Sequence, residues 1–195
     1  MSGNVILKGK VKPAMVRFGF LGEDNMYWNS EKTLLNIQGT FELSSKNRFA
    51  NGVIIRVDKN AKLSLEKNVS IGNKSKIICS ELITIGEDTS ITWECQIIDT
   101  NFHYIVDLND KSVTKLTQPI VIGKNVFIGY RSTISKGVIL EDFAIVCSYS
   151  LVNKNMELDK YSMYAGIPAK IIKKGYYRAM YNEEREIKQK IANKL

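Results

Sequence analysis

The chain of 195 residues has little of what most metal-binding and disulfide-bonded proteins need. It contains one histidine and three cysteines, and Cys79, Cys95 and Cys147 form no CxxC pair and have no histidine cluster beside them. One histidine per chain does not supply the several ligands of a typical zinc enzyme. We therefore expect no metal cofactor and no disulfide framework, and we interpret the cysteines as buried reduced thiols.

Long apolar runs are also missing from the first residues. Between Met1 and Lys12 the apolar run is limited to Val5-Ile6-Leu7, which is too short for a signal peptide or a membrane span. We therefore expect a cytoplasmic protein. The formal net charge is +8, but the lysines are spread along the chain without an aromatic and basic recognition motif. Nucleic acid is thus not an expected partner, whereas an anionic small molecule would suit this charge.

The chain is rich in a repeat with a period of six residues. From Ile122 onward an aliphatic residue recurs at every sixth position, namely at Ile122, Ile128, Ile134, Leu140, Val146 and Val152. An α-helix does not explain this spacing, because a six-residue step leaves the same face of a helix with about 3.6 residues per turn. The residues that follow each aliphatic are typical of a short strand and a tight corner. The repeat predicts stacked units that bury their apolar faces against one another.

The same six-residue spacing of aliphatic residues is present upstream and sets the expected boundaries of the repeat domain. It runs through Leu65, Ile71 and Ile77 and, after an eight-residue step, through Ile85, Ile91 and Ile97. Residues before about Phe49 fit it poorly, so we expect an irregular N-terminal segment over residues 1–48 and a repeat domain over 49–172. Inside that domain, the polar composition of residues 101–119 predicts an excursion loop.

The last residues have a different period. From Lys173 onward, apolar residues recur mostly in steps of four among glutamates and lysines, which predicts an amphipathic helix over residues 173–195. We expect this helix to cover the last open coil of the repeat domain or to contact another subunit.

The repeat resembles that of the hexapeptide-repeat acyltransferases. Members of this family fold as an all-β, left-handed parallel β-helix, a triangular prism with one hexapeptide on each side. On that template Ile122 stacks on Leu140, and the other aliphatics form the dry interior. The left hand is implied by the resemblance alone, because it departs from the right-handed rule for parallel crossovers. The resemblance also implies a homotrimer with active sites between subunits.

His103 is the candidate catalytic base. It ends the stretch Asp99-Thr100-Asn101-Phe102-His103 at the start of the excursion loop. This stretch resembles the Asp-Ser/Thr-Asp/Asn-x-His segment of sugar and capsular-polysaccharide O-acetyltransferases, in which the histidine is the base. A neutral imidazole accepts a proton at cellular pH, and the resemblance implies that it deprotonates a sugar hydroxyl attacking acetyl-CoA.

The neighbours of His103 supply further candidates. A carboxylate that holds the other ring nitrogen would fix the tautomer, and Asp99 is our first candidate, with Glu94 as the alternative. Trp93, Asn101 and Tyr104 are candidates for contact with the acceptor sugar. For Trp93, simple packing in a repeat corner is an equal alternative.

A second motif points to coenzyme A. The segment Ala165-Gly166-Ile167-Pro168-Ala169-Lys170 resembles the AGxPAK segment that ends the β-helix in CoA-using members of the family. The resemblance implies that Gly166 and Lys170 belong to the acetyl-CoA site, with Lys170 at the phosphates. Ser148 and Lys154 match positions that line the CoA path.

Three further positions concern the same site. The backbone N–H of Gly129 is a candidate oxyanion donor, although a corner that merely requires glycine explains it equally well. Phe127 stands where tryptophan is usual in the family and keeps an aromatic surface for CoA. Tyr149 stands where glycine is common.

The residues leave other functions open. An N-acetyltransferase of a nucleotide-linked amino sugar is the first alternative, because the choice of a hydroxyl acceptor depends on the stretch before His103 alone. A metal bound by three copies of His103 on a trimer axis and a non-catalytic β-helix are the others.

Overall fold

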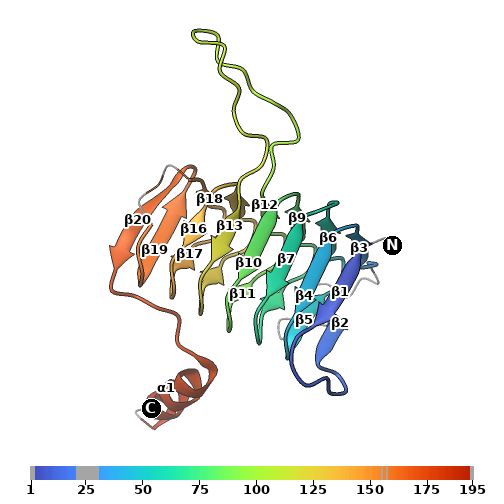
Figure 1. The fold of residues 1–195 in the computed structure, drawn as a ribbon. Coiled ribbons are helices and arrows are strands. Elements are labelled where there is room, and N and C mark those ends of the chain that lie inside the picture. Colours follow the sequence, from blue (N-terminus) through green and yellow to red (C-terminus); the bar gives the residue numbers. More distant parts are fainter. Residues whose placement is uncertain (1–2, 21–30, 155, 157, 194–195) are drawn as a thin grey trace.

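The strands form the three faces of a prism (Figure 1). A computed structural model describes residues 3–20, 31–154, 156 and 158–193. From β1 to β18, successive strands belong to sheets A, B and C in turn, and strands of neighbouring coils pair in parallel. The architecture is the left-handed parallel β-helix that the resemblance implied.

Each sheet takes one strand from successive coils. Sheet A contains β1 (Asn4–Leu7), β4 (Thr40–Leu43), β7 (Lys62–Leu65), β10 (Leu82–Ile85), β13 (Ile120–Ile122) and β16 (Ile139–Leu140). Sheet B contains β2 (Val16–Phe20), β5 (Asn47–Ala50), β8 (Ser70–Ile71), β11 (Ser90–Ile91), β14 (Phe127–Ile128), β17 (Ile145–Val146), β19 (Ser162–Gly166) and β20 (Ala169–Lys174). Sheet C contains β3 (Leu34–Ile37), β6 (Ile54–Val57), β9 (Lys76–Cys79), β12 (Gln96–Ile98), β15 (Thr133–Ser135) and β18 (Leu151–Val152).

The aliphatic ladder is the core of the prism. As predicted, Ile122 pairs with Leu140, Ile128 with Val146, and Ile134 with Val152. All six of these side chains are at most 2% exposed. Burying each one contributes about 1.5–3 kcal/mol relative to leaving it in water, so the stack of coils is the main source of stability.

The prediction of an irregular segment over residues 1–48 was wrong for the described part of that range. β1 to β5 lie largely within it, and β1 pairs with β4, β2 with β5, and β3 with β6. The hexapeptide pattern is hard to read here because the turns between these strands have unequal lengths. Residues 1–2 and 21–30 lie outside the described residues.

The prism has three edges, two of which carry candidate site residues. The loop edge, between sheets C and A, contains residues 58–61, Ser80 and Glu81, the excursion loop and Lys136. The aromatic edge, between sheets B and C, contains Trp93, Tyr130 and Tyr149. Figure 1 shows the excursion loop projecting far from the prism between β12 and β13, at the predicted position.

The C-terminal residues differ from the predicted helix over residues 173–195. β19 pairs in parallel with β17 and then forms an antiparallel hairpin with β20, which extends to Lys174. Helix α1 (Tyr181–Ala192) begins only after this hairpin and stands away from the prism (Figure 1). The helix therefore does not cover the last coil. It is tethered through Tyr177, whose ring lies against Phe143 and Tyr161 on the third edge. Its apolar residues Ile187 and Ile191 are exposed.

The cysteines are free thiols, as expected. Cys79 and Cys95 are buried, and Cys147 is half-buried. Within the described residues, no helix has the length and apolar character needed to cross a membrane.

Candidate active site

The excursion loop begins at a fixed point. Asp99 is fully buried, and its two carboxylate oxygens accept hydrogen bonds from the backbone N–H groups of Ser80, Glu81 and Leu82 at 2.7–3.0 Å. Burial raises the pKa of Asp99 above its ordinary range, and the three amide donors oppose this rise. The carboxylate thus closes the corner of the coil below.

The prediction that Asp99 orients His103 is not supported by this geometry. The carboxylate faces the corner at Ser80, and no hydrogen bond joins it to His103 in the described structure. The alternative, Glu94, lies on the aromatic edge in an ion pair with Arg131. Asp99 therefore positions the first residues of the loop, and neither carboxylate is placed to fix the imidazole tautomer within one chain.

His103 lies four residues beyond this anchor. It is exposed, like its neighbours from Asn101 to Lys115. The residue before it, Phe102, has a left-handed backbone (φ 61°), and the guanidinium of Arg56 lies 5.9 Å from its ring centroid. An exposed imidazole on a projecting loop contributes little to packing, so its side chain is available for chemistry.

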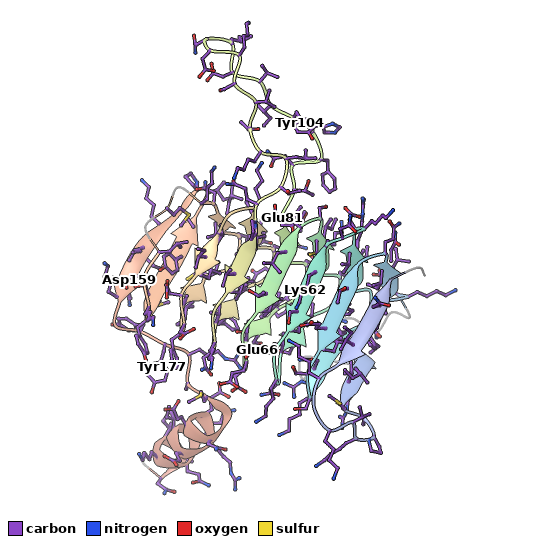
Figure 2. All side chains as sticks on the ribbon, viewed as in Figure 1. Lys62, Glu66, Glu81, Tyr104, Asp159 and Tyr177 are labelled. Carbon is purple, nitrogen blue, oxygen red and sulfur yellow. The ribbon has the colours of Figure 1, made fainter. Side chains whose placement is uncertain are left out.

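The three acceptor candidates do not come together. Asn101 and Tyr104 lie on the loop beside His103, and Figure 2 shows Tyr104 on the projecting loop, clear of the prism. Trp93 lies on the opposite edge of sheet C, where its ring stacks on Tyr130 with centroids 5.0 Å apart. One face of Trp93 is therefore used in packing, and within one chain Trp93 is not beside His103.

Gly129 is a packing glycine. A Cβ atom there would lie 2.5 Å from the backbone nitrogen of Ser148 in the next coil. Its own N–H donates to the carbonyl of Val146 at 2.7 Å, so that donor is already used in the sheet. This geometry favours the simpler explanation, a corner that requires glycine, and the oxyanion role of Gly129 stays a prediction.

Most of the remaining CoA candidates lie on sheet B and the aromatic edge. Ser148 is at that edge, and Gly166 ends β19, where its N–H donates to Ser150 Oγ at 3.3 Å. Lys170 is exposed on β20 and pairs with Ala165 across the hairpin. Phe127 lies on the outer face of sheet B, with the guanidinium of Arg178 5.1 Å from its ring centroid.

Lys154 lies apart from this group, whereas Tyr149 lies at the aromatic edge and departs only from the residue type that is usual in the family. Lys154 is exposed and lies beyond β18 at the loop edge, the edge that carries His103. Tyr149 has a left-handed backbone (φ 57°), a conformation that glycine adopts with least strain, which explains why glycine suits this position. Its hydroxyl accepts a hydrogen bond from Arg131 at 2.6 Å.

Sequence reasoning missed two cations near these edges. Arg131 joins Glu94 to Tyr149 and lines a surface hollow of about 500 Å³ with Lys76 and Gln96. Lys136 contacts the excursion loop itself. Neither residue lies in a motif, and only the stacking of coils places them next to residues far away in sequence.

The chain is similar to known sequences over most of its length. Residues 119–148 match the family described as "Hexapeptide repeat of succinyl-transferase". A 24.8 kDa protein from the cps region of Klebsiella pneumoniae is 32% identical over 146 residues, which cover 75% of this chain and 64% of that protein. The match thus spans slightly under two thirds of that relative's length.

Two further similarities concern transferases. The putative lipopolysaccharide biosynthesis O-acetyl transferase WbbJ of Escherichia coli (strain K12) is 29% identical over 152 residues, covering 73% of this chain and 74% of that protein. Among solved structures, a mutant of AntD, an N-acyltransferase from Bacillus cereus, in complex with dTDP and coenzyme A, matches with a TM-score of 0.62. The identity is 18%, and the match covers 92% of this chain and 91% of that one.

Proposed function

We propose that this chain, which belongs to the hexapeptide-repeat family of left-handed β-helix acyltransferases, moves an acetyl group from acetyl-CoA to a hydroxyl of a saccharide. The observation that carries the proposal is the position of its one histidine. His103 is exposed at the start of the excursion loop, four residues after the buried anchor Asp99. The name of the relative WbbJ supports a hydroxyl acceptor in a lipopolysaccharide or a similar saccharide.

The chemistry needs one base and a bound thioester. The imidazole of His103 takes the proton of the acceptor hydroxyl while the oxygen attacks the thioester carbonyl. The carbon–sulfur bond then breaks, and the proton passes from the imidazolium to the departing thiolate of coenzyme A. General-base assistance of this kind contributes about 10²–10⁴-fold in rate. No protein group has to be covalently acetylated.

The acetyl-CoA site lies on sheet B and the aromatic edge. Lys170 places an ammonium group on the exposed strand β20, and Arg178 adds a guanidinium beside Phe127. Phosphates are bound well by such cations, and Phe127 offers a ring for the adenine or the pantetheine chain. The net charge of +8 also favours this polyanionic co-substrate.

The positions of these groups support a site that two copies of the chain build together. His103 extends from the loop edge. Ser148 lies at the aromatic edge, on the far side of sheet C, and Lys170 lies on sheet B. We propose a homotrimer in which the loop edge of one copy faces the aromatic edge of the next, so that each site is built by two chains. This arrangement also places Lys154, on the loop edge, near the same co-substrate.

The experiment is an acetyl-CoA consumption assay with free sugars, nucleotide sugars and capsular oligosaccharides, followed by mass spectrometry of the product. A sugar ester supports the proposal. An amide on an amino sugar would favour the N-acyltransferase alternative, which the fold of AntD also accommodates. Metal analysis of the purified protein checks whether three His103 side chains bind an ion on the trimer axis.

A further inference from the structure

The base of the excursion loop consists of two short limbs that pair with each other. The outgoing limb is residues 99–101, and the returning limb is residues 116–118. Thr100 and Thr117 form an antiparallel bridge, the N–H of Asn101 donates to the carbonyl of Leu116 at 3.0 Å, and the N–H of Gln118 donates to the carbonyl of Asp99 at 3.0 Å. The position of the backbone that leads to His103 therefore depends on how firmly these two limbs are held.

The two limbs are held from opposite directions. Asp99 fastens the outgoing limb to the coil below, through three amides. The returning limb is held from the coil above by two residues that follow β15, the side chain of Lys136 and the backbone N–H of Gly137, which donates to the carbonyls of Gln118 at 3.2 Å and Pro119 at 3.1 Å. Lys136 Nζ donates to the carbonyl of Lys115 and, at 3.3 Å, to the carbonyl of Leu116.

The contact of Lys136 differs from an ordinary surface ion pair. Its ammonium is bonded to two backbone carbonyls, and none of the carboxylates in the described residues forms an ion pair with it. Burial, and then the charge of Lys154, lower the pKa of Lys136. The hydrogen bonds of this half-buried ammonium all go to the backbone of the loop. Lys136 therefore fixes the position of the loop, and it contributes less to the stability of the core.

One peptide group connects this lysine to the neighbourhood of His103. The carbonyl of Leu116 accepts hydrogen bonds from both Lys136 Nζ and the N–H of Asn101. Asn101 precedes His103 by two residues. Beyond this point residues 101–115 are all exposed, so the described chain offers little other packing to define where the imidazole stands.

We propose that Lys136 is a positioning residue for acetyl transfer, because it holds the returning limb at Leu116 and thereby fixes the limb that presents His103. The inference rests on the function proposed above, in which His103 is the base. A misplacement of a catalytic group by about 1 Å can cost up to about 10²-fold in rate, so the loss of this hold should be seen in kcat.

The test compares Lys136→Met, which keeps an unbranched side chain one atom shorter but removes its donors, with Lys136→Arg, which keeps donors. Lys115→Met is the matched control, because it removes a lysine side chain from the residue just before the returning limb and leaves the carbonyl that Lys136 binds. We expect kcat to fall roughly tenfold in Lys136→Met, with a nearly unchanged KM for acetyl-CoA, and to recover largely in Lys136→Arg. Lys115→Met should match the wild type.

Two further measurements separate positioning from general destabilisation. In a His103→Ala background, Lys136→Met should have no additional effect on turnover, because the lysine acts only through that histidine. Hydrogen exchange at the amides of Asn101 and Gln118 should be at least about tenfold faster in Lys136→Met than in the wild type or Lys115→Met. If Lys136→Met does not unfold cooperatively, Lys136→Leu, which also lacks a donor, takes its place.

The outcomes distinguish this inference from the proposed function. A wild type that transfers no acetyl group, or a His103→Ala variant that keeps its rate, would overturn the proposed function and the role of Lys136 with it. A wild type that depends on His103 while Lys136→Met keeps full kcat would overturn the positioning role alone. An unchanged rate of hydrogen exchange at the Asn101 amide in Lys136→Met would also overturn the positioning role alone.

Discussion

The loop edge and the aromatic edge are built from the same repeat but serve different purposes. At the aromatic edge, Trp93 stacks on Tyr130, Tyr130 meets Tyr149 edge to face, and Gly129 fits against the next coil with no room for a Cβ atom. At the loop edge the chain leaves the prism, and polar groups such as Asp99 and Lys136 fasten the two limbs that depart.

The difference shows how a repeat fold acquires a function. A corner whose side chains stack on their neighbours contributes to stability and tolerates little change in volume. A corner from which the chain departs loses that stacking, and it needs hydrogen bonds to the coils above and below to remain placed. We therefore expect changes at the loop edge to affect catalysis, and changes at the aromatic edge to affect folding or co-substrate binding.

The largest effect is expected at the loop edge. His103→Ala should lower kcat by about 10²–10⁴-fold, which corresponds to about 3–5 kcal/mol of transition-state stabilisation. The melting temperature and the affinity for acetyl-CoA should stay near the wild-type values, because the side chain is exposed. Steady-state kinetics, calorimetry and titration with coenzyme A check this.

Lys111→Ala, near the tip of the same loop, is the control for this variant. It should leave turnover unchanged. A joint loss of melting temperature and rate in His103→Ala would show a structural histidine, and the comparison of the two edges would then fail.

The next effect is expected at the aromatic edge. Gly129→Ala places a Cβ atom 2.5 Å from the backbone nitrogen of Ser148, so two coils must move apart. We expect a loss of about 1–3 kcal/mol in the free energy of unfolding, the usual cost of overpacking. Chemical denaturation measures it. A variant as stable as the wild type would mean that the coils at this edge are not packed tightly.

A smaller effect is expected on co-substrate binding. Lys170→Glu should raise the KM for acetyl-CoA by roughly tenfold, about 1.4 kcal/mol, with less change in kcat, because the contact with the phosphates is made equally in the ground and transition states. Lys173→Glu, on the same strand, is the matched control, since its ammonium lies over the ring of Tyr176. Equal effects of the two substitutions would indicate only a general influence of charge.

The smallest effect is expected away from both edges, on the outer face of sheet A. Hydrogen bonds from Lys62 and then Lys8 hold the pKa of Glu42 at about 2 instead of 4.5. A carboxyl whose pKa is lower in the folded state stabilises the fold at neutral pH, and this stability is lost as the pH falls from about 4.5 toward 2. Both lysines are partly exposed, which limits the gain to about 1 kcal/mol.

The variant Glu42→Gln isolates this contribution. Its free energy of unfolding should be about 1 kcal/mol lower than that of the wild type at neutral pH, and the two proteins should converge near pH 2. Denaturation measured at several pH values provides the comparison. Parallel curves over the whole pH range would show that Glu42 contributes no pH-dependent stability.

The six-residue period predicted the register from Ile122 to Val152 correctly, because burial along a short strand is a local property that the sequence displays directly. The same reasoning failed before Phe49, where coils of unequal length hide the period although the strands stack in the same way. The excursion loop was predicted from its polar composition. The sequence also singled out Asp99 at its root, but it did not reveal that the carboxylate binds backbone amides of the coil below.

The sequence by itself determined the stacked coils, the place where the chain leaves them and the lone histidine on that loop. Tertiary structure alone decided that Asp99 binds the amides of the coil below, that Gly129 has no free donor, and that Lys136 reaches Leu116 from the coil above. The physical reason is that an apolar period reports burial one strand at a time, whereas hydrogen-bond partners depend on which corner of one coil comes to lie over which corner of the next.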